Sequence, residues 1–142
     1  MKTKMMLGLV AAVLLTQAGC TTKIQSLPLP AALQSQNAQD VALYFGEQRH
    51  APVRQTLGSK EFAVRVPRQP QDSREFTCNL ALAKGVQQLR DFAREQHANA
   101  VINVTTRFQH NESTSPNEFK CGASLNGSTL AVRGDIVMLE TQ

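Results

Sequence analysis

Three cysteines are the residues of this 142-residue chain that are most able to do chemistry. A thiol can be acylated, oxidised to a disulfide or used to hold a metal ion, depending on its surroundings. Cys20 follows an apolar run near the N-terminus, whereas Cys78 and Cys121 lie further along the chain. No CxxC or HxxH spacing supports a metal site, and the histidines are expected in loops or at a helix end: His50, His97 and His110.

Residues 1–19 predict a signal peptide. Lys2 and Lys4 precede an apolar run over residues 5–15, and small residues follow before Cys20. The apolar run is shorter than the roughly 20 residues that a membrane-spanning helix needs. The chain is therefore expected to be exported rather than to cross the membrane by a helix.

The residues around Cys20 resemble the lipobox of bacterial lipoproteins. Ala18 and Gly19 stand directly before the cysteine, although Gln17 occupies a position that is usually apolar. The resemblance implies cleavage before Cys20 and its acylation with fatty acids such as palmitate. Thr21, in place of an Asp, favours the outer membrane, with the protein facing the periplasm. The alternative is an ordinary secretory signal cut near Cys20, which leaves that thiol incidental.

Charge and composition argue against nucleic-acid binding. The chain has 15 basic and 11 acidic residues, a net charge of +4 and a pI of about 9.3. Loss of Lys2 and Lys4 with the signal leaves 13 basic against 11 acidic residues, or +2. There is no Trp, a single Tyr and no basic–aromatic cluster. No catalytic motif such as GxSxG is present either, so no enzymatic activity and no cofactor is expected.

The mature chain divides into a tether and one domain. Residues 20–39 are rich in Gln, Ser, Pro and Ala, which predicts a polar tether. The alternative is that Leu27, Leu29 and Leu33 pack onto the domain. Residues 40–142 are enough for a single small domain.

A long helix is expected after residue 71. Asp72 and Glu75 have the spacing of a capping box, and the helix should end near residues 97–99. One apolar stripe recurs at helical spacing: Cys78, Leu82, Val86, Leu89 and Ala93. Gly85 either destabilises the helix slightly or marks a position where a strand approaches the helix closely.

The remaining apolar patterns predict an antiparallel sheet of four to five strands packed against this helix, an α+β fold. Strands are expected at 41–45, 61–66, 100–108, 119–125 and 130–138, with loops at 48–59 and 109–117. Within 100–108, Ala100, Ile102, Val104 and Phe108 are expected to share a face.

Asn126-Gly127 is a strong hairpin signal between the last two strands. A two-residue turn there would pair Leu125 with Ser128 and Ala123 with Leu130, and apolar residues would then share a face. A continuous strand through Asn126-Gly127 is the alternative.

Cys78 and Cys121 are expected to form a disulfide. Cys78 lies on the apolar stripe of the helix and Cys121 on the apolar face of a strand, so both point into the same layer. In an exported chain such a pair favours a bridge, which stabilises a small domain by roughly 4 kcal/mol on the chain-entropy model. Two buried free thiols or a metal pair are the alternatives.

The domain also resembles two known groups of lipoproteins. The resemblance rests on the cysteine-bearing helix, on residues 97–102 (HANAVI), on residues 119–123 (FKCGA) and on the terminal strand. The first group comprises small proteobacterial lipoproteins often mislabelled as the ATPase component of excinuclease ABC. The second, more distant, is the Rcs stress-sensor lipoprotein, whose domain has an antiparallel sheet, a helix and disulfides. That sensor has four domain cysteines, so only the bridge between Cys78 and Cys121 carries over.

The excinuclease label does not fit the residues. An ATPase of that kind needs the phosphate-binding motif GxxxxGK[ST], and the nearest run, residues 57–60 (LGSK), has the wrong order. The resemblance instead implies a lipid-anchored interaction module of the cell envelope, a stress sensor or an accessory lipoprotein that contacts another envelope protein. A periplasmic domain that binds a small ligand or a metal ion is the alternative.

Overall fold

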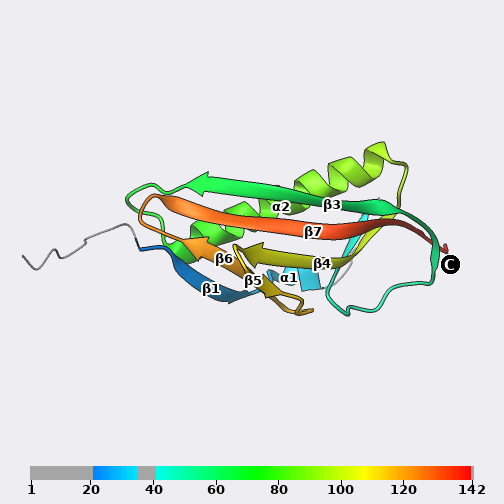
Figure 1. The fold of residues 1–142 in the computed structure, drawn as a ribbon, viewed down its shortest axis with the longest axis horizontal. Helices are drawn as coiled ribbons and strands as arrows, with labels where there is room; N and C mark the ends of the chain where they lie inside the picture. The colour runs from blue at the N-terminus through cyan, green and yellow to red at the C-terminus, as the bar shows by residue number, and fades with distance from the viewer. Residues whose placement is uncertain (1–20, 35–40, 142) are drawn as a thin grey trace, which may run out of the picture.

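The computed structural model describes residues 21–34 and 41–141. It is a mixed α/β fold in which a seven-stranded sheet packs against one long helix (Figure 1). The predicted signal peptide and Cys20 lie outside the described residues. The elements, in chain order, are β1 Lys23–Pro28, α1 Ala31–Gln34, β2 Ala42–Phe45, β3 Val53–Pro67, α2 Arg74–Glu95, β4 Ala100–Phe108, β5 Asn111–Ser113, β6 Glu118–Ala123 and β7 Gly127–Leu139.

The sheet has more strands than the sequence predicts, and one of its pairings is parallel. Its strands are hydrogen-bonded in the order β1-β6-β7-β4-β2. Two further strands lie outside this series: β3 pairs with β7, and β5 pairs with β4. Every pairing is antiparallel except that of β2 with β4. The connection from β2 to β4 contains β3 and α2, which is long enough for a parallel crossover. The two unpredicted strands are β1 and β5.

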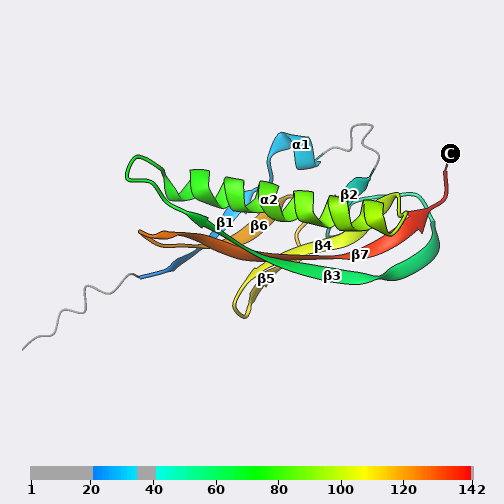
Figure 2. The ribbon, with the colours of Figure 1, turned by 90° about the horizontal axis from the view of Figure 1, so that it is seen from above.

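The long helix α2 covers one face of the sheet (Figure 2). The predicted stripe is confirmed: Cys78, Leu82, Val86, Leu89 and Ala93 are all buried. Gly85 marks a close approach, because a Cβ at that position would lie 2.6 Å from Cγ1 of Val132 on β7. The predicted capping residue is wrong by one position. Ser73 is the N-cap and accepts a hydrogen bond from the Phe76 N–H, while Asp72 accepts one from Gln69.

The predicted tether is wrong for residues 21–34, and the alternative packing is what the structure has. β1 pairs along its whole length with β6, from Lys23 opposite Ala123 to Pro28 opposite Glu118. Leu29 and Leu33 are buried in the main core, and Leu27 packs against it. The domain therefore starts at β1 rather than at residue 40. The rest of the predicted tether, residues 35–39, lies outside the described residues.

A bulge in β4 overturns the predicted alternation of that strand. Asn103 has φ 51°, and the register with β7 shifts between Ile102 and Thr105. Val104 therefore lies in the core under α2, whereas Ala100 and Ile102 join a second small cluster. A bulge inserts one extra residue, so the residues beyond it change faces.

The hairpin between β6 and β7 exists, but its turn is centred one residue earlier than predicted. Ala123 pairs with Ser128, and the Ser124 N–H donates to the Gly127 carbonyl at 2.9 Å. Leu125 is therefore at the turn and is 65 % exposed. Gly127 does not form the turn; it allows close packing against β3, because a Cβ at this position would lie 2.4 Å from the Val66 carbonyl oxygen. A shift of two residues in pairing keeps each side chain on its predicted face.

Two predicted loops contain strand. β3 begins at Val53 rather than near residue 61, and it pairs with β7 as far as Leu139. Its first half has register shifts near Gln55 and Gly58, so its side chains do not alternate there as a regular strand would. The predicted loop 109–117 contains β5, which forms a short hairpin with the end of β4.

Candidate interaction surface

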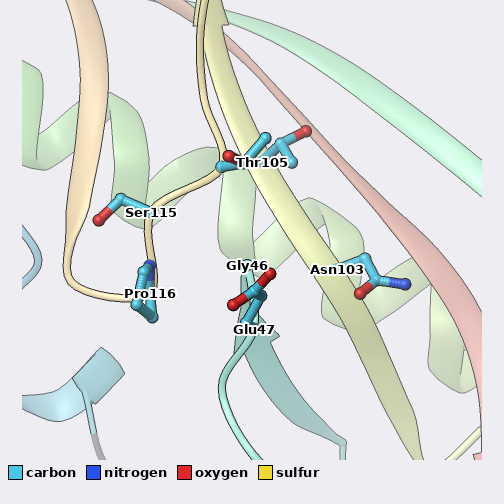
Figure 3. A pocket seen from close by; sticks show the side chains of 7 residues that line it. Gly46, Glu47, Asn103, Thr105, Ser115 and Pro116 are labelled. Carbon is cyan, nitrogen blue, oxygen red and sulfur yellow. The ribbon is translucent and has the colours of Figure 1, made fainter.

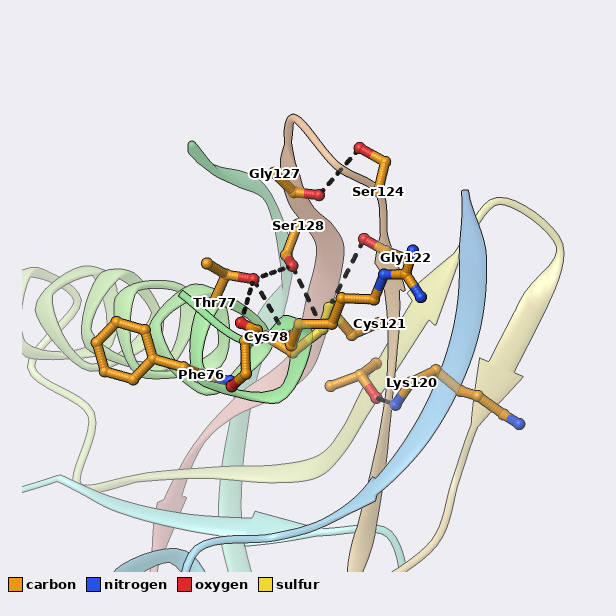
Figure 4. Close-up of a disulfide and its surroundings, with 12 residues drawn as sticks. Phe76, Thr77, Cys78, Lys120, Cys121, Gly122, Ser124, Gly127 and Ser128 are labelled. Atoms are coloured by element: carbon orange, nitrogen blue, oxygen red, sulfur yellow. Dashed lines mark hydrogen bonds between the residues drawn. A yellow bond between two sulfur atoms is a disulfide. The ribbon is translucent and has the colours of Figure 1, made fainter. Parts of the chain in front are cut away.

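Cys78 and Cys121 form a disulfide that joins α2 to β6 (Figure 4). Both residues are fully buried, and 43 positions of sequence separate them. Closing a loop of that length restricts the unfolded chain, which stabilises the folded state. The predicted bridge is thus present and ties the first turns of the helix to the sheet.

Two buried hydroxyl groups flank the disulfide. Thr77 and Ser128 are fully buried, and their oxygen atoms are 2.5 Å apart in a hydrogen bond between α2 and β7. Ser128 Oγ also lies 3.5 Å from Cys78 Sγ (Figure 4). A buried hydroxyl without a partner would be costly, so this pair fixes one relative position of helix and sheet.

The histidines do not come together. The rings of His50 and Tyr44 contact each other at a tilt, with 5.4 Å between their centroids, and His97 follows the C-cap of α2 with φ 61°. His110 lies in the turn between β4 and β5. Among residues 21–34 and 41–141, no group of three or more His, Cys, Asp or Glu side chains is placed to hold a metal ion.

A pocket of about 430 Å³ lies where β2 ends beside β4 and the β5–β6 loop (Figure 3). Gly46 allows this arrangement: its φ is 53°, and a Cβ there would lie 2.1 Å from the Thr114 carbonyl oxygen. The side-chain amide of Gln48 stabilises the rim of the pocket by donating a hydrogen bond to the Pro116 carbonyl oxygen, 2.7 Å from its Nε2. Glu47 is the one charged residue of a lining that is otherwise small or polar: Gly46, Asn103, Thr105, Thr114, Ser115 and Pro116.

Among the described residues, a second apolar cluster covers one end of the sheet face opposite α2. There, Ala100, Ile102, Val137 and Leu139 pack against Tyr44 and Ala51 of the β2–β3 region. In Figure 2, the helix lies on one side of the sheet and β5 on the other. We call the rest of this side the open face. Strand register assigns to it Glu61, Ala63 and Arg65 of β3, Thr129, Ala131, Arg133 and Asp135 of β7, Thr105 and Arg107 of β4, Glu112 of β5, and Lys120 and Gly122 of β6.

A shallow depression of about 250 Å³ lies in the open face. Its lining includes Ala63, Ala131 and Thr129 of the two long strands, together with Arg107 and Phe108. Small residues on β3 and β7 leave the space. Phe108 closes one side by lying over Gly122, where a Cβ would come within 2.3 Å of the ring.

Charged side chains surround the depression. Arg107 on β4 donates to both carboxylate oxygens of Glu61 on β3, so this ion pair spans β7. The hydrogen bond and the charge of Glu61 raise the pKa of Arg107. Arg65 and Arg133 are exposed on the same face. The open face therefore combines a small apolar floor with charged side chains of both signs, among which basic residues are slightly more numerous.

Sequence reasoning found only part of this surface. The pattern of residues 61–66 correctly predicted a strand, and Phe62, Val64 and Val66 of that strand face the core while Glu61 and Arg65 face the other way. The depression was missed, because it depends on Phe108 lying over Gly122, which no local pattern predicts. The glycine in FKCGA is the signal that could have indicated a close approach.

Neither protein-family models, nor curated proteins, nor solved structures give a match to this chain. Among the described residues, none of the helices is both long and apolar enough to span a membrane.

Proposed function

We propose that this chain is a lipid-anchored interaction module of the bacterial cell envelope, held in the outer membrane through acyl chains on Cys20 and facing the periplasm. Its open face binds another envelope protein. The observation that carries the proposal is the open face itself, a sheet surface with an apolar depression amid charged side chains. As a stress sensor or accessory, the domain would act by binding rather than by catalysis.

The composition of the open face supports a protein partner. An apolar floor offers area to be buried, and exposed arginines are among the residues enriched in protein interfaces. The side of the sheet that bears the open face has four basic residues, Arg65, Arg107, Lys120 and Arg133, against three acidic residues, Glu61, Glu112 and Asp135. We therefore infer that the contact surface of the partner carries acidic side chains.

The lipid anchor is supported by the sequence. Ala18-Gly19-Cys20 resembles a lipobox, and the small lipoproteins that the domain resembles carry the same feature. Two or more acyl chains give lasting membrane attachment, because one myristoyl chain alone binds only marginally. A disulfide between buried cysteines agrees with an oxidising compartment outside the cytoplasm.

Photo-cross-linking in intact cells tests the proposal. A photoreactive residue at position 63 reports on the open face, and one at position 84, on the exposed side of α2, is the matched control. We expect a defined protein adduct from position 63 alone, and its loss with R133E. Equal adducts from both positions, or none from position 63, would contradict the proposal.

The pocket beside Glu47 supports the second candidate, a domain that binds a small polar ligand. The pocket adjoins the open face at Thr105 and is lined mainly by hydroxyl and amide groups. Small-ligand sites place a few polar groups in such a concave surface. The candidate predicts that E47K, which reverses the charge of Glu47 in this lining, abolishes a ligand found by native mass spectrometry while leaving the adduct from position 63 intact. Loss of the adduct in the same variant would assign the pocket to the protein interface.

A further inference from the structure

We propose that the domain rests directly on the lipid surface through the end at which β1 begins, rather than standing away from the membrane on a tether. This inference rests on the proposed acylation of Cys20. It adds the orientation of the domain and names the side chains that enter the bilayer interface.

The short length of chain between Cys20 and the sheet places the start of β1 close to the proposed lipid anchor. β1 begins at Lys23, three positions after Cys20. A fully extended chain spans at most about 3.6 Å per residue, so these two Cα atoms are no more than about 11 Å apart. Acyl chains on Cys20 would therefore hold the start of β1 within the headgroup layer, whatever path the intervening residues take.

Five segments meet at this end of the molecule, which we call the β1 end. Lys23 pairs with Ala123 at the end of β6, and Gly127 at the start of β7 pairs with Pro67 at the end of β3. The hydrogen bond between Thr77 and Ser128 adds the first turn of α2. Both ribbon views place these segments together at one extreme of the long axis (Figures 1 and 2). Anchoring β1 thus brings the β6–β7 turn and the start of α2 to the same membrane.

Exposed large apolar side chains gather at the β1 end. Leu125 at the β6–β7 turn is 65 % exposed, and Phe76 in the first turn of α2 is 49 % exposed. Leu80, one turn further along the helix, and Ile24 in β1 are exposed as well. Among the described residues, Val53 is the remaining exposed large apolar side chain, and it lies at the opposite end of β3. Such side chains gain by entering the lipid interface.

The charge of the β1 end also suits a lipid surface. The β1 end carries more basic than acidic residues. The basic residues are Lys23, Arg65, Arg68 and Arg74, and the acidic residues are Asp72 and Glu75. Basic side chains near apolar anchors bind anionic headgroups while their stems cover apolar surface. The strands then run away from the membrane, so the open face points sideways and is accessible to a neighbouring protein.

Tryptophan fluorescence tests the orientation, because the chain has no tryptophan of its own. L125W places a reporter at the β1 end, and V53W, at an exposed valine of the opposite end, is its matched control. Each acylated full-length variant is reconstituted into phosphatidylethanolamine–phosphatidylglycerol vesicles containing phosphatidylcholine brominated in its acyl chains. Circular dichroism and the absence of free thiols show that the fold is kept, and F76W replaces L125W should that variant misfold.

We expect brominated lipid to quench L125W several-fold more strongly than V53W, with a blue shift of L125W emission on reconstitution. Equal quenching of the two reporters, or none in L125W, would overturn the orientation while leaving the anchor in place, provided that the protein floats with the vesicles. Material purified from its own membranes without acyl chains on Cys20 would overturn the proposed function and this inference together.

Discussion

The two faces of the sheet carry different kinds of side chain, although the same strands supply both. Beneath α2, Val64, Val132 and Ile136 are buried with the disulfide in one apolar core. On the open face, Ala63 and Arg133 come from the same two strands and contact solvent. Strand alternation separates the residues that hold the fold from those free to bind a partner.

This separation means that stability and binding can be changed independently. A substitution under α2 creates a cavity or removes a constraint, whereas one on the open face alters only what a partner contacts. The following predictions test that difference, from the largest expected effect on stability to the smallest.

Removal of the disulfide should have the largest effect. For C78A/C121A, the chain-entropy model with a loop of 43 residues gives a loss of about 4 kcal/mol in the free energy of unfolding. Urea denaturation of the oxidised wild type and the double variant measures it. A loss below about 1 kcal/mol would show that helix and sheet hold together without the bridge.

Truncation of Leu29 should destabilise the domain nearly as much. Leu29 is 2 % exposed and belongs to the core, so L29A should cost about 3 kcal/mol through lost burial and a residual cavity. The control is S26A in the same segment, at an exposed position. Equal midpoints for the two variants in urea would mean that residues 21–34 do not contribute to the domain.

Adding a methyl group at Gly85 should destabilise the domain by a smaller amount. G85A improves helix propensity by about 1 kcal/mol, but its methyl group would lie 2.6 Å from Val132 and overpack the core, at a cost of about 1–3 kcal/mol. We expect a net loss. In a double-mutant cycle, G85A should be less harmful in a V132A background, which provides space for the methyl group. Strict additivity would refute the steric explanation.

A charge on the open face should leave stability almost unchanged. Ala63 is exposed, so the free energy of unfolding of A63E should lie within about 0.5 kcal/mol of the wild type, yet less of the acidic partner should co-purify with A63E than with the wild type. The adjacent variant V64E, which buries a carboxylate under α2, should lower the melting temperature of the domain. Thermal denaturation of both variants measures the contrast. Similar melting temperatures would contradict the assignment of faces.

The sequence predicted features that depend on a long, regular pattern. The stripe of α2 spans four turns, so its buried side chains could be read directly, and the disulfide followed from it. β2 was also found, ended by Gly46 in a positive-φ conformation. These elements are determined by residues close together in the chain.

Features that depend on distant contacts were missed. β1 is an edge strand of mixed polar residues that exists because β6 offers its backbone groups, and strand formation of this kind depends on context. The bulge at Asn103 uses a left-handed conformation that is uncommon outside glycine. Gly127 permits contact with Val66 instead of forming the turn. The depression in the open face needs Phe108 and Gly122, from different strands, and could not be predicted locally.

The central claim is that fatty acids on Cys20 hold this domain at a membrane, where its open face meets a protein partner. Intact-mass analysis of the wild type and C20S, purified from the membranes of cells expressing the full chain, tests it most directly. The account predicts that the wild type is heavier than the chain starting at residue 20 by the mass of its acyl chains, and that C20S lacks this increment and leaves the membrane fraction. Identical mass increments and identical fractionation for the two proteins would contradict it.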